Sequence, residues 1–165
     1  MDMTHAELCE IARMWLTRRN TLCNHGCHLG LLGREWMKGA HVPDVLGFKA
    51  VGKRVESVAI QVRLAWSDAD ESARKQPPAK TLGMGLYRYY LCPEGAIQPY
   101  QLPPRWGMLW VTRKGQVVPM AGAVAESWNR LTFHSVAQDW QHERDIEQES
   151  WLLVRAMTRQ PFSLP

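Results

Sequence analysis

The chain has 165 residues, of which 45% are hydrophobic and 22% are charged. This length and composition predict a single globular domain over residues 1–165 and exclude a wholly disordered chain. Lysine and arginine outnumber the acidic residues by 20 to 16, a net charge of +4 that permits a nucleic-acid partner without requiring one.

No apolar run approaches the roughly 20 residues that a membrane-spanning helix needs. Acidic residues interrupt the N-terminal segment, which therefore does not resemble a secretory signal. We accordingly expect a cytoplasmic protein with no membrane partner. In that compartment the four cysteines are predicted to be reduced thiols rather than a disulfide framework.

Three segments have the pattern of helices. Thr4 followed by Glu7 forms a capping-box signature, and apolar residues at helical spacing then predict a helix over 5–19. Acidic residues at the front and basic residues at the back predict a short helix over 67–75. A closing helix is predicted over 145–158, and its expected inward stripe is Ile146, Glu149, Leu152, Leu153 and Met157.

The segment 57–66 has the clearest strand pattern in the chain. Its apolar residues Val58, Ile60, Val62 and Leu64 alternate with a second face that carries Gln61 and Arg63. Shorter strands are predicted over 28–32, 43–48, 85–92, 106–112 and 116–119. The pattern of 121–138 is ambiguous, and 98–105 is expected to be a loop or a single helical turn. A helix, mixed strands with an inserted helix, and a final helix together predict an α/β or α+β domain.

Asp44 and the polar face of the 57–66 strand form the first candidate site. If Asp44 lies beside Gln61 and Arg63 on a neighbouring strand, two oxygen ligands suit a hard cation such as Mg²⁺, and the arginine suits a phosphate. The alternative is a solvated polar face on which Arg63 lies along the surface.

Cysteine and histidine residues form a second candidate, a zinc site. Cys23, His25, Cys27 and His28 cluster in sequence, and His5 and Cys9 share one face of the first helix. The spacing lacks a second well-separated pair, so small buried cysteines and surface histidines are the alternative. Cys92 lies in an apolar strand with no nucleophile signature around it.

Basic and aromatic residues alternate in the second half of the chain. This pattern suits phosphate contacts and base stacking, although a solvated face above core aromatics explains it equally well. The residues concerned are Arg74, Lys75, Lys80, Arg88, Arg105, Arg113 and Lys114, with Tyr87, Tyr89 and Trp106 among them.

Several segments resemble a phage- and prophage-borne branch of the PD-(D/E)xK nuclease superfamily, near the MmcB-like DNA-repair proteins. The segments are VPDVLGF, SVAIQVRLAWSD and GMGLYRYYLCPEGAIQPYQLPPRWGMLWV, together with the opening and closing helices. The resemblance covers most of the chain. It implies a restriction-endonuclease-like core, in which a mixed central sheet is flanked by N- and C-terminal helices.

The resemblance also implies a metal-dependent phosphodiesterase centre. In that superfamily an Asp, and a Glu followed two residues later by a Lys, bind the metal and position the attacking water. Here the corresponding residues are Asp44, Gln61 and Arg63, and Glu35 is a candidate further metal ligand. Gln61 lacks the charge that a hard cation prefers, and Arg63 cannot act as a deprotonated lysine.

These substitutions lead us to expect a nuclease-like protein that binds DNA or a nucleoprotein partner, with weak or lost phosphodiesterase activity and a weak or absent Mg²⁺ site. The DNA contacts are expected from Arg74, Lys75, Lys80 and Arg88. Three alternatives stay open: an active Mg²⁺-dependent DNA endonuclease with a variant centre, an anti-defence factor that binds a protein, and a structural part of a larger complex. A homodimer is compatible with each of them.

Overall fold

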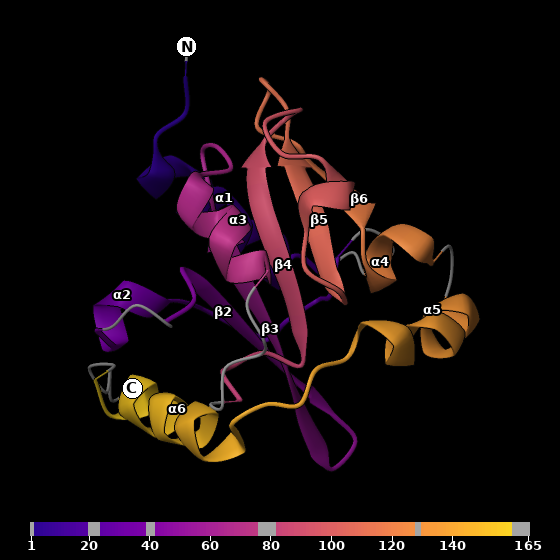
Figure 1. Cartoon of the computed structure of the whole chain (residues 1–165). Coiled ribbons are helices and arrows are strands. Elements are labelled where there is room, and N and C mark those ends of the chain that lie inside the picture. Colours follow the sequence, from indigo (N-terminus) through magenta and orange to yellow (C-terminus); the bar gives the residue numbers. More distant parts are fainter. Residues whose placement is uncertain (1, 20–23, 39–41, 76–81, 128–129, 160–165) are drawn as a thin grey trace.

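A six-stranded mixed sheet forms the centre of the molecule (Figure 1). The computed structural model describes residues 2–19, 24–38, 42–75, 82–127 and 130–159. The strands follow one another across the sheet in chain order, and they are β1 (Leu29–Leu32), β2 (Val45–Val51), β3 (Arg54–Val62), β4 (Tyr87–Pro93), β5 (Trp106–Val111) and β6 (Val117–Ala121). The first three are antiparallel neighbours, β3, β4 and β5 are parallel, and β6 is antiparallel to β5.

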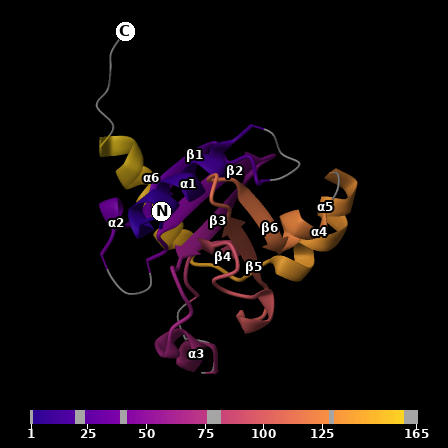
Figure 2. The ribbon, with the colours of Figure 1, turned by 90° about the horizontal axis from the view of Figure 1, so that it is seen from above.

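Helices flank this sheet, among them one near the N-terminus and one near the C-terminus. They are α1 (His5–Thr17), α2 (Gly33–Trp36), α3 (Asp68–Lys75), α4 (Ala123–Glu126), α5 (Arg130–Ala137) and α6 (Ile146–Arg159), with 3₁₀ turns η1 (Pro99–Gln101) and η2 (Gln138–Trp140). The predicted α+β class, a mixed sheet between N- and C-terminal helices, is confirmed. Figure 2 shows α3 standing out from the sheet on one side and α4 and α5 gathered beside β6.

The two faces of β3 are covered by different helices. On one face Val58 and Ile60 pack in a core cluster with Leu8 and Leu16 of α1. On the other face Ala59 packs in a cluster with residues of α6. The capping box predicted from Thr4 and Glu7 is present and fixes the start of α1.

The predicted strand 57–66 differs from β3 in its position and in its faces. The strand ends at Val62, so Leu64, expected on the buried face, is 50% exposed. The face expected to be polar is buried at Ala59, because α6 covers it there. Only its C-terminal end, at Gln61 and Arg63, is polar and partly exposed.

The inward stripe predicted for the closing helix is correct in the middle and wrong at both ends. Leu152 is fully buried and Glu149 is 4% exposed, whereas Ile146 is 62% and Met157 is 70% exposed. The cause lies in Glu149, whose carboxylate accepts hydrogen bonds from Ser57 Oγ at 2.6 Å and from the Gly85 N–H at 2.8 Å. These bonds set the rotation of α6, so its buried face continues to Ala156 instead of Met157.

The ambiguous stretch 121–138 contains the end of β6, followed by α4 and α5. The loop or single turn expected at 98–105 contains η1. None of the helices in the described part of the chain is both long and apolar enough to cross a membrane.

Candidate functional site

Asp44, Gln61 and Arg63 come together where β2 begins and β3 ends. Because these strands are antiparallel, with Val45 opposite Ile60, the residue before β2 lies beside the last residues of β3. The backbone N–H of Val62 donates a hydrogen bond of 2.8 Å to Asp44 Oδ2. The β2–β3 hairpin therefore produces the juxtaposition that the sequence suggested.

These three residues line one cavity of about 370 Å³. Among the described residues, its lining is Arg34, Met37, Lys38, Val42, Asp44, Gln61 and Arg63. Three of these side chains are cationic and one is a carboxylate, so the cavity has an excess of positive charge. Such a lining favours an anionic ligand over a bare cation.

The carboxylate of Asp44 is 5% exposed and is surrounded by positively charged or ionisable groups. His5 Nε2 lies 3.4 Å from Oδ1, Arg34 Nε lies 3.6 Å from the same oxygen, and Arg63 Nη1 lies 3.7 Å from Oδ2. A buried carboxylate requires such partners, because an unpaired buried charge is costly.

Arg63 is held in place by several contacts. Its Nη1 donates to the Val62 carbonyl at 3.0 Å, its Nε donates to Asp70 Oδ1 at 3.3 Å, and the guanidinium lies over the Tyr90 ring. Burial would raise the pKa of Asp70, but hydrogen bonds from Ser67 and Arg63 outweigh it and lower that pKa. Arg63 is thus oriented toward the cavity by an ionised partner.

Arg34 and Lys38 reach the cavity from α2 and its C-terminal end, a segment for which the sequence predicted no helix. The Gly33 N–H donates to the Asp44 carbonyl at 2.9 Å. A Cβ atom on Gly33 would lie 1.9 Å from the Pro43 carbonyl oxygen, so only glycine permits this approach. No pattern in the sequence predicts that these two cations reach the cavity.

Glu35 lies on the same short helix but does not line the cavity; its side chain is exposed. Among the described lining residues, Asp44 is therefore the single carboxylate, and the Gln61 amide is the other side-chain oxygen donor. Mg²⁺ prefers several oxygen ligands and gains affinity from carboxylate charge, so this donor set and the surrounding cations fit it poorly. The expected Mg²⁺ site stays a prediction that the donor set does not favour.

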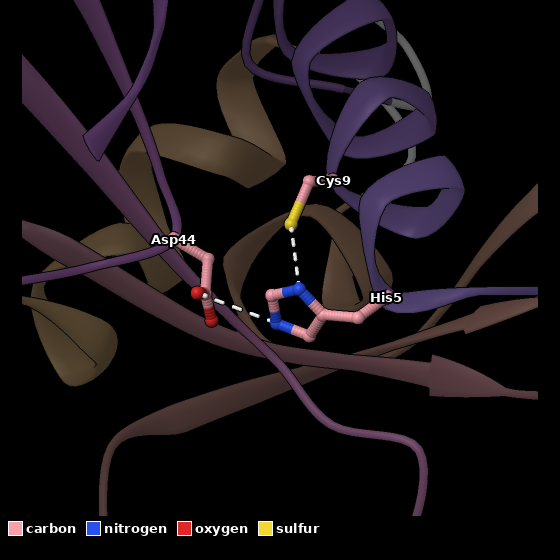
Figure 3. Close-up of side chains that lie close together, drawn as sticks. All are labelled: His5, Cys9 and Asp44. Atoms are coloured by element: carbon pink, nitrogen blue, oxygen red, sulfur yellow. Dashed lines mark hydrogen bonds and ion pairs between the residues drawn. The ribbon is translucent and has the colours of Figure 1, made fainter. Parts of the chain in front are cut away.

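His5 and Cys9 lie against Asp44 on the side of α1 (Figure 3). Cys9 Sγ lies 3.6 Å from His5 Nδ1, while the other ring nitrogen faces Asp44. Burial raises the pKa of the Cys9 thiol to about 11, and the charge of Asp44 adds to the rise. Among the described residues, this is the one group of three or more metal-ligating side chains.

The other cysteine and histidine residues of the predicted zinc site do not form such a group within the described residues. Cys23 lies outside them. His25 is buried with its Nε2 2.6 Å from the Tyr89 hydroxyl, and His28 Nδ1 accepts a hydrogen bond from the Ala50 N–H. Cys27 is a buried free thiol, and burial raises its pKa to about 12.

Of the four predicted DNA-binding residues, the three that the structure describes do not line the cavity. Arg74 and Lys75 form ion pairs with Glu71 on the exposed α3, and the hydrogen bond from Arg74 contributes most to lowering the pKa of Glu71 to about 2. Arg88 donates to the backbone carbonyls of Leu82, Gly85 and Glu143, and it thereby ties β4 to flanking loops. Lys80 lies outside the described residues.

No protein-family model, curated protein or solved structure matches this chain. The resemblance to the PD-(D/E)xK superfamily therefore stays a prediction from the residues quoted above.

Proposed function

We propose that this chain binds the phosphodiester backbone of DNA in the cavity between α2 and the end of β3, with little or no hydrolysis. The observation that carries the proposal is the charge of the described lining, in which three cations accompany one buried carboxylate that already pairs with two of them, Arg34 and Arg63. A phosphodiester group has one negative charge and accepts hydrogen bonds from arginine in a bidentate manner.

The cavity cations differ in their freedom to contact a ligand. The Arg34 side chain is 78% exposed and Lys38 is also exposed, so both can turn toward a phosphate. Arg63 is fixed by Asp70 and the Val62 carbonyl. Two exposed cations and one fixed cation suit a backbone that reaches the cavity from solvent.

Loss of hydrolysis is supported by the same lining. A metal-dependent nuclease needs a cation that polarises the phosphate and activates a water molecule. Gln61 contributes no charge at the position where the superfamily has a glutamate, and Arg63 keeps a permanent positive charge beside Asp44. Both features weaken the binding of a hard cation such as Mg²⁺ inside the cavity.

The test measures fluorescence anisotropy of labelled single-stranded and duplex DNA. Arg34→Ala is expected to weaken binding, whereas Lys53→Ala, which removes an exposed charge in the turn at the far end of β3, is expected to leave it nearly unchanged. Equal effects of the two variants would refute the proposed location. Binding that is insensitive to salt would favour the protein-binding alternative instead.

A nicking assay on supercoiled DNA with Mg²⁺ or Mn²⁺ tests the absence of hydrolysis. We expect no cleavage by the natural chain, and a gain of cleavage when Gln61→Glu and Arg63→Lys are combined. Cleavage by the natural chain that disappears in Asp44→Asn would overturn this part of the proposal and establish the endonuclease alternative.

A further inference from the structure

Three side chains of different chemistry meet at the junction of α1 and β2. His5 and Cys9 are four residues apart on α1 and so share one face of the helix, and Asp44 faces them from the start of β2 (Figure 3). One ligand atom from each lies within 4.8 Å of the others. An imidazole, a thiol and a carboxylate form a donor set of the kind that zinc takes in proteins.

The separation between Cys9 and His5 is close to that of two ligands in a tetrahedral site. From Zn–S and Zn–N bonds of about 2.3 and 2.0 Å, a sulfur and a nitrogen ligand lie roughly 3.5 Å apart. The Cys9 Sγ to His5 Nδ1 distance is 3.6 Å. Asp44 contacts the other ring nitrogen, Nε2, at 3.4 Å, so its carboxylate and the His5 ring must rotate to bring all three ligands to one ion.

We propose that His5, Cys9 and Asp44 bind a divalent ion of the zinc class on the α1 side of Asp44. On binding, the Cys9 thiol loses its proton to solvent and the thiolate coordinates the ion. The soft sulfur ligand selects Zn²⁺ over the Mg²⁺ expected from the sequence. His5 is one-third exposed, so an ion from solvent has a path to the site.

A nucleophilic cysteine is the competing interpretation of the same three residues. A thiol of that kind needs access to its substrate and a stabilised thiolate. Cys9 is only 8% exposed, and the neighbouring Asp44 charge opposes ionisation of its thiol. A bound cation offsets the Asp44 charge and so favours the Cys9 thiolate, whereas a protein substrate brings no such charge.

Arg34 competes with the ion for one oxygen of Asp44. Its Nε lies 3.6 Å from Oδ1, the oxygen that also faces His5, but its side chain is 78% exposed and can move away. Removal of this charge is therefore expected to tighten ion binding about fivefold, by the screened repulsion between a guanidinium and a dication. The same variant is expected to weaken DNA binding. Arg34→Ala therefore changes the two affinities in opposite directions, which distinguishes the ion site from the DNA site.

The test is a titration of the metal-stripped full chain with Co²⁺, whose thiolate complexes absorb in the near ultraviolet. We expect this band in the natural chain, its disappearance on addition of Zn²⁺, and its loss in Cys9→Ser. The matched controls Cys23→Ser and Cys27→Ala are expected to keep the band. No band in the natural chain, or a band that survives Cys9→Ser, would overturn the proposal.

Two further variants keep the test decisive. His5→Asn changes a partly exposed residue at the start of α1 and is expected to weaken Co²⁺ binding at least tenfold, while Arg34→Ala is expected to strengthen it. Unchanged affinity in both variants contradicts the assignment even if Cys9→Ser does not fold. The titration contains no nucleic acid, so failure here and failure of DNA binding are distinguishable.

Discussion

The salt dependence of DNA binding gives a quantitative test of the cavity. Each phosphate contact made by a lysine or arginine adds about 0.9 to the slope of log K against log salt for duplex DNA. Three cations line the cavity, so their combined contribution is a slope of about −2.7. Raising salt from about 50 to about 200 mM should then weaken binding about 40-fold through these contacts alone.

Removing the two exposed cations reduces this dependence in a defined way. The Arg34→Ala and Lys38→Ala double variant keeps only Arg63, so the same salt increase should cost it about 3.5-fold through the cavity. Fluorescence anisotropy at four or more salt concentrations measures both slopes, and the Lys53→Ala chain serves as the control. Parallel slopes in the natural chain and the double variant would refute phosphate contact by these side chains.

Four other perturbations test the site and the fold. Asp44→Asn keeps an oxygen for the Val62 N–H but removes the negative charge of the cavity, so anisotropy should show DNA binding about fivefold tighter. In urea unfolding, Glu149→Ala should cost about 3 kcal/mol because Arg144 and the Gly85 N–H lose their buried partner, whereas the exposed Glu147→Ala should cost under about 0.5 kcal/mol. Gly33→Ala should lower both stability and DNA affinity, since its Cβ would collide with the Pro43 carbonyl; intact binding would contradict the geometry of α2. Burial lowers the pKa of His25 from 6.5 to about 3, so the unfolded chain binds the proton first as the pH falls. The free energy of unfolding should decrease below about pH 6.5 by up to about 1.4 kcal/mol per pH unit, and His25→Gln should remove this component.

The strands and the outer helices were predictable because their signals are local. The alternation around Val58 and Ile60 and the capping box at Thr4 depend on a few neighbouring residues. The face of α6 was less predictable. Its rotation depends on Glu149, whose partner Ser57 is 92 residues away along the chain.

The candidate site was predictable in part for the same reason. Asp44, Gln61 and Arg63 belong to one hairpin, so a strand pattern and a short turn are enough to bring them together. Arg34 and Lys38 were missed because α2 has four residues and no apolar periodicity. Its position depends on a close approach of Gly33 to the backbone of Pro43, which no pattern in the sequence reports.

The spacing of His5 and Cys9 was visible in the sequence, but their third partner was not. Asp44 is 35 residues beyond Cys9, and only the packing of α1 across β2 and β3 brings them together. The sequence therefore predicted the helical pair as part of a zinc site and assigned Asp44 to a different centre. In the structure one carboxylate belongs to both groups.

This shared carboxylate determines what the cavity cations can do. A buried Asp44 is stable as an anion only while positive groups or hydrogen-bond donors face it. Arg63 and the Val62 N–H satisfy Oδ2 and are held by the strand, whereas Oδ1 faces His5 and the exposed Arg34. A zinc-class ion on Oδ1 would replace Arg34 as the partner of that oxygen. The freed guanidinium would then turn to the cavity, so ion binding and phosphate binding should strengthen each other there.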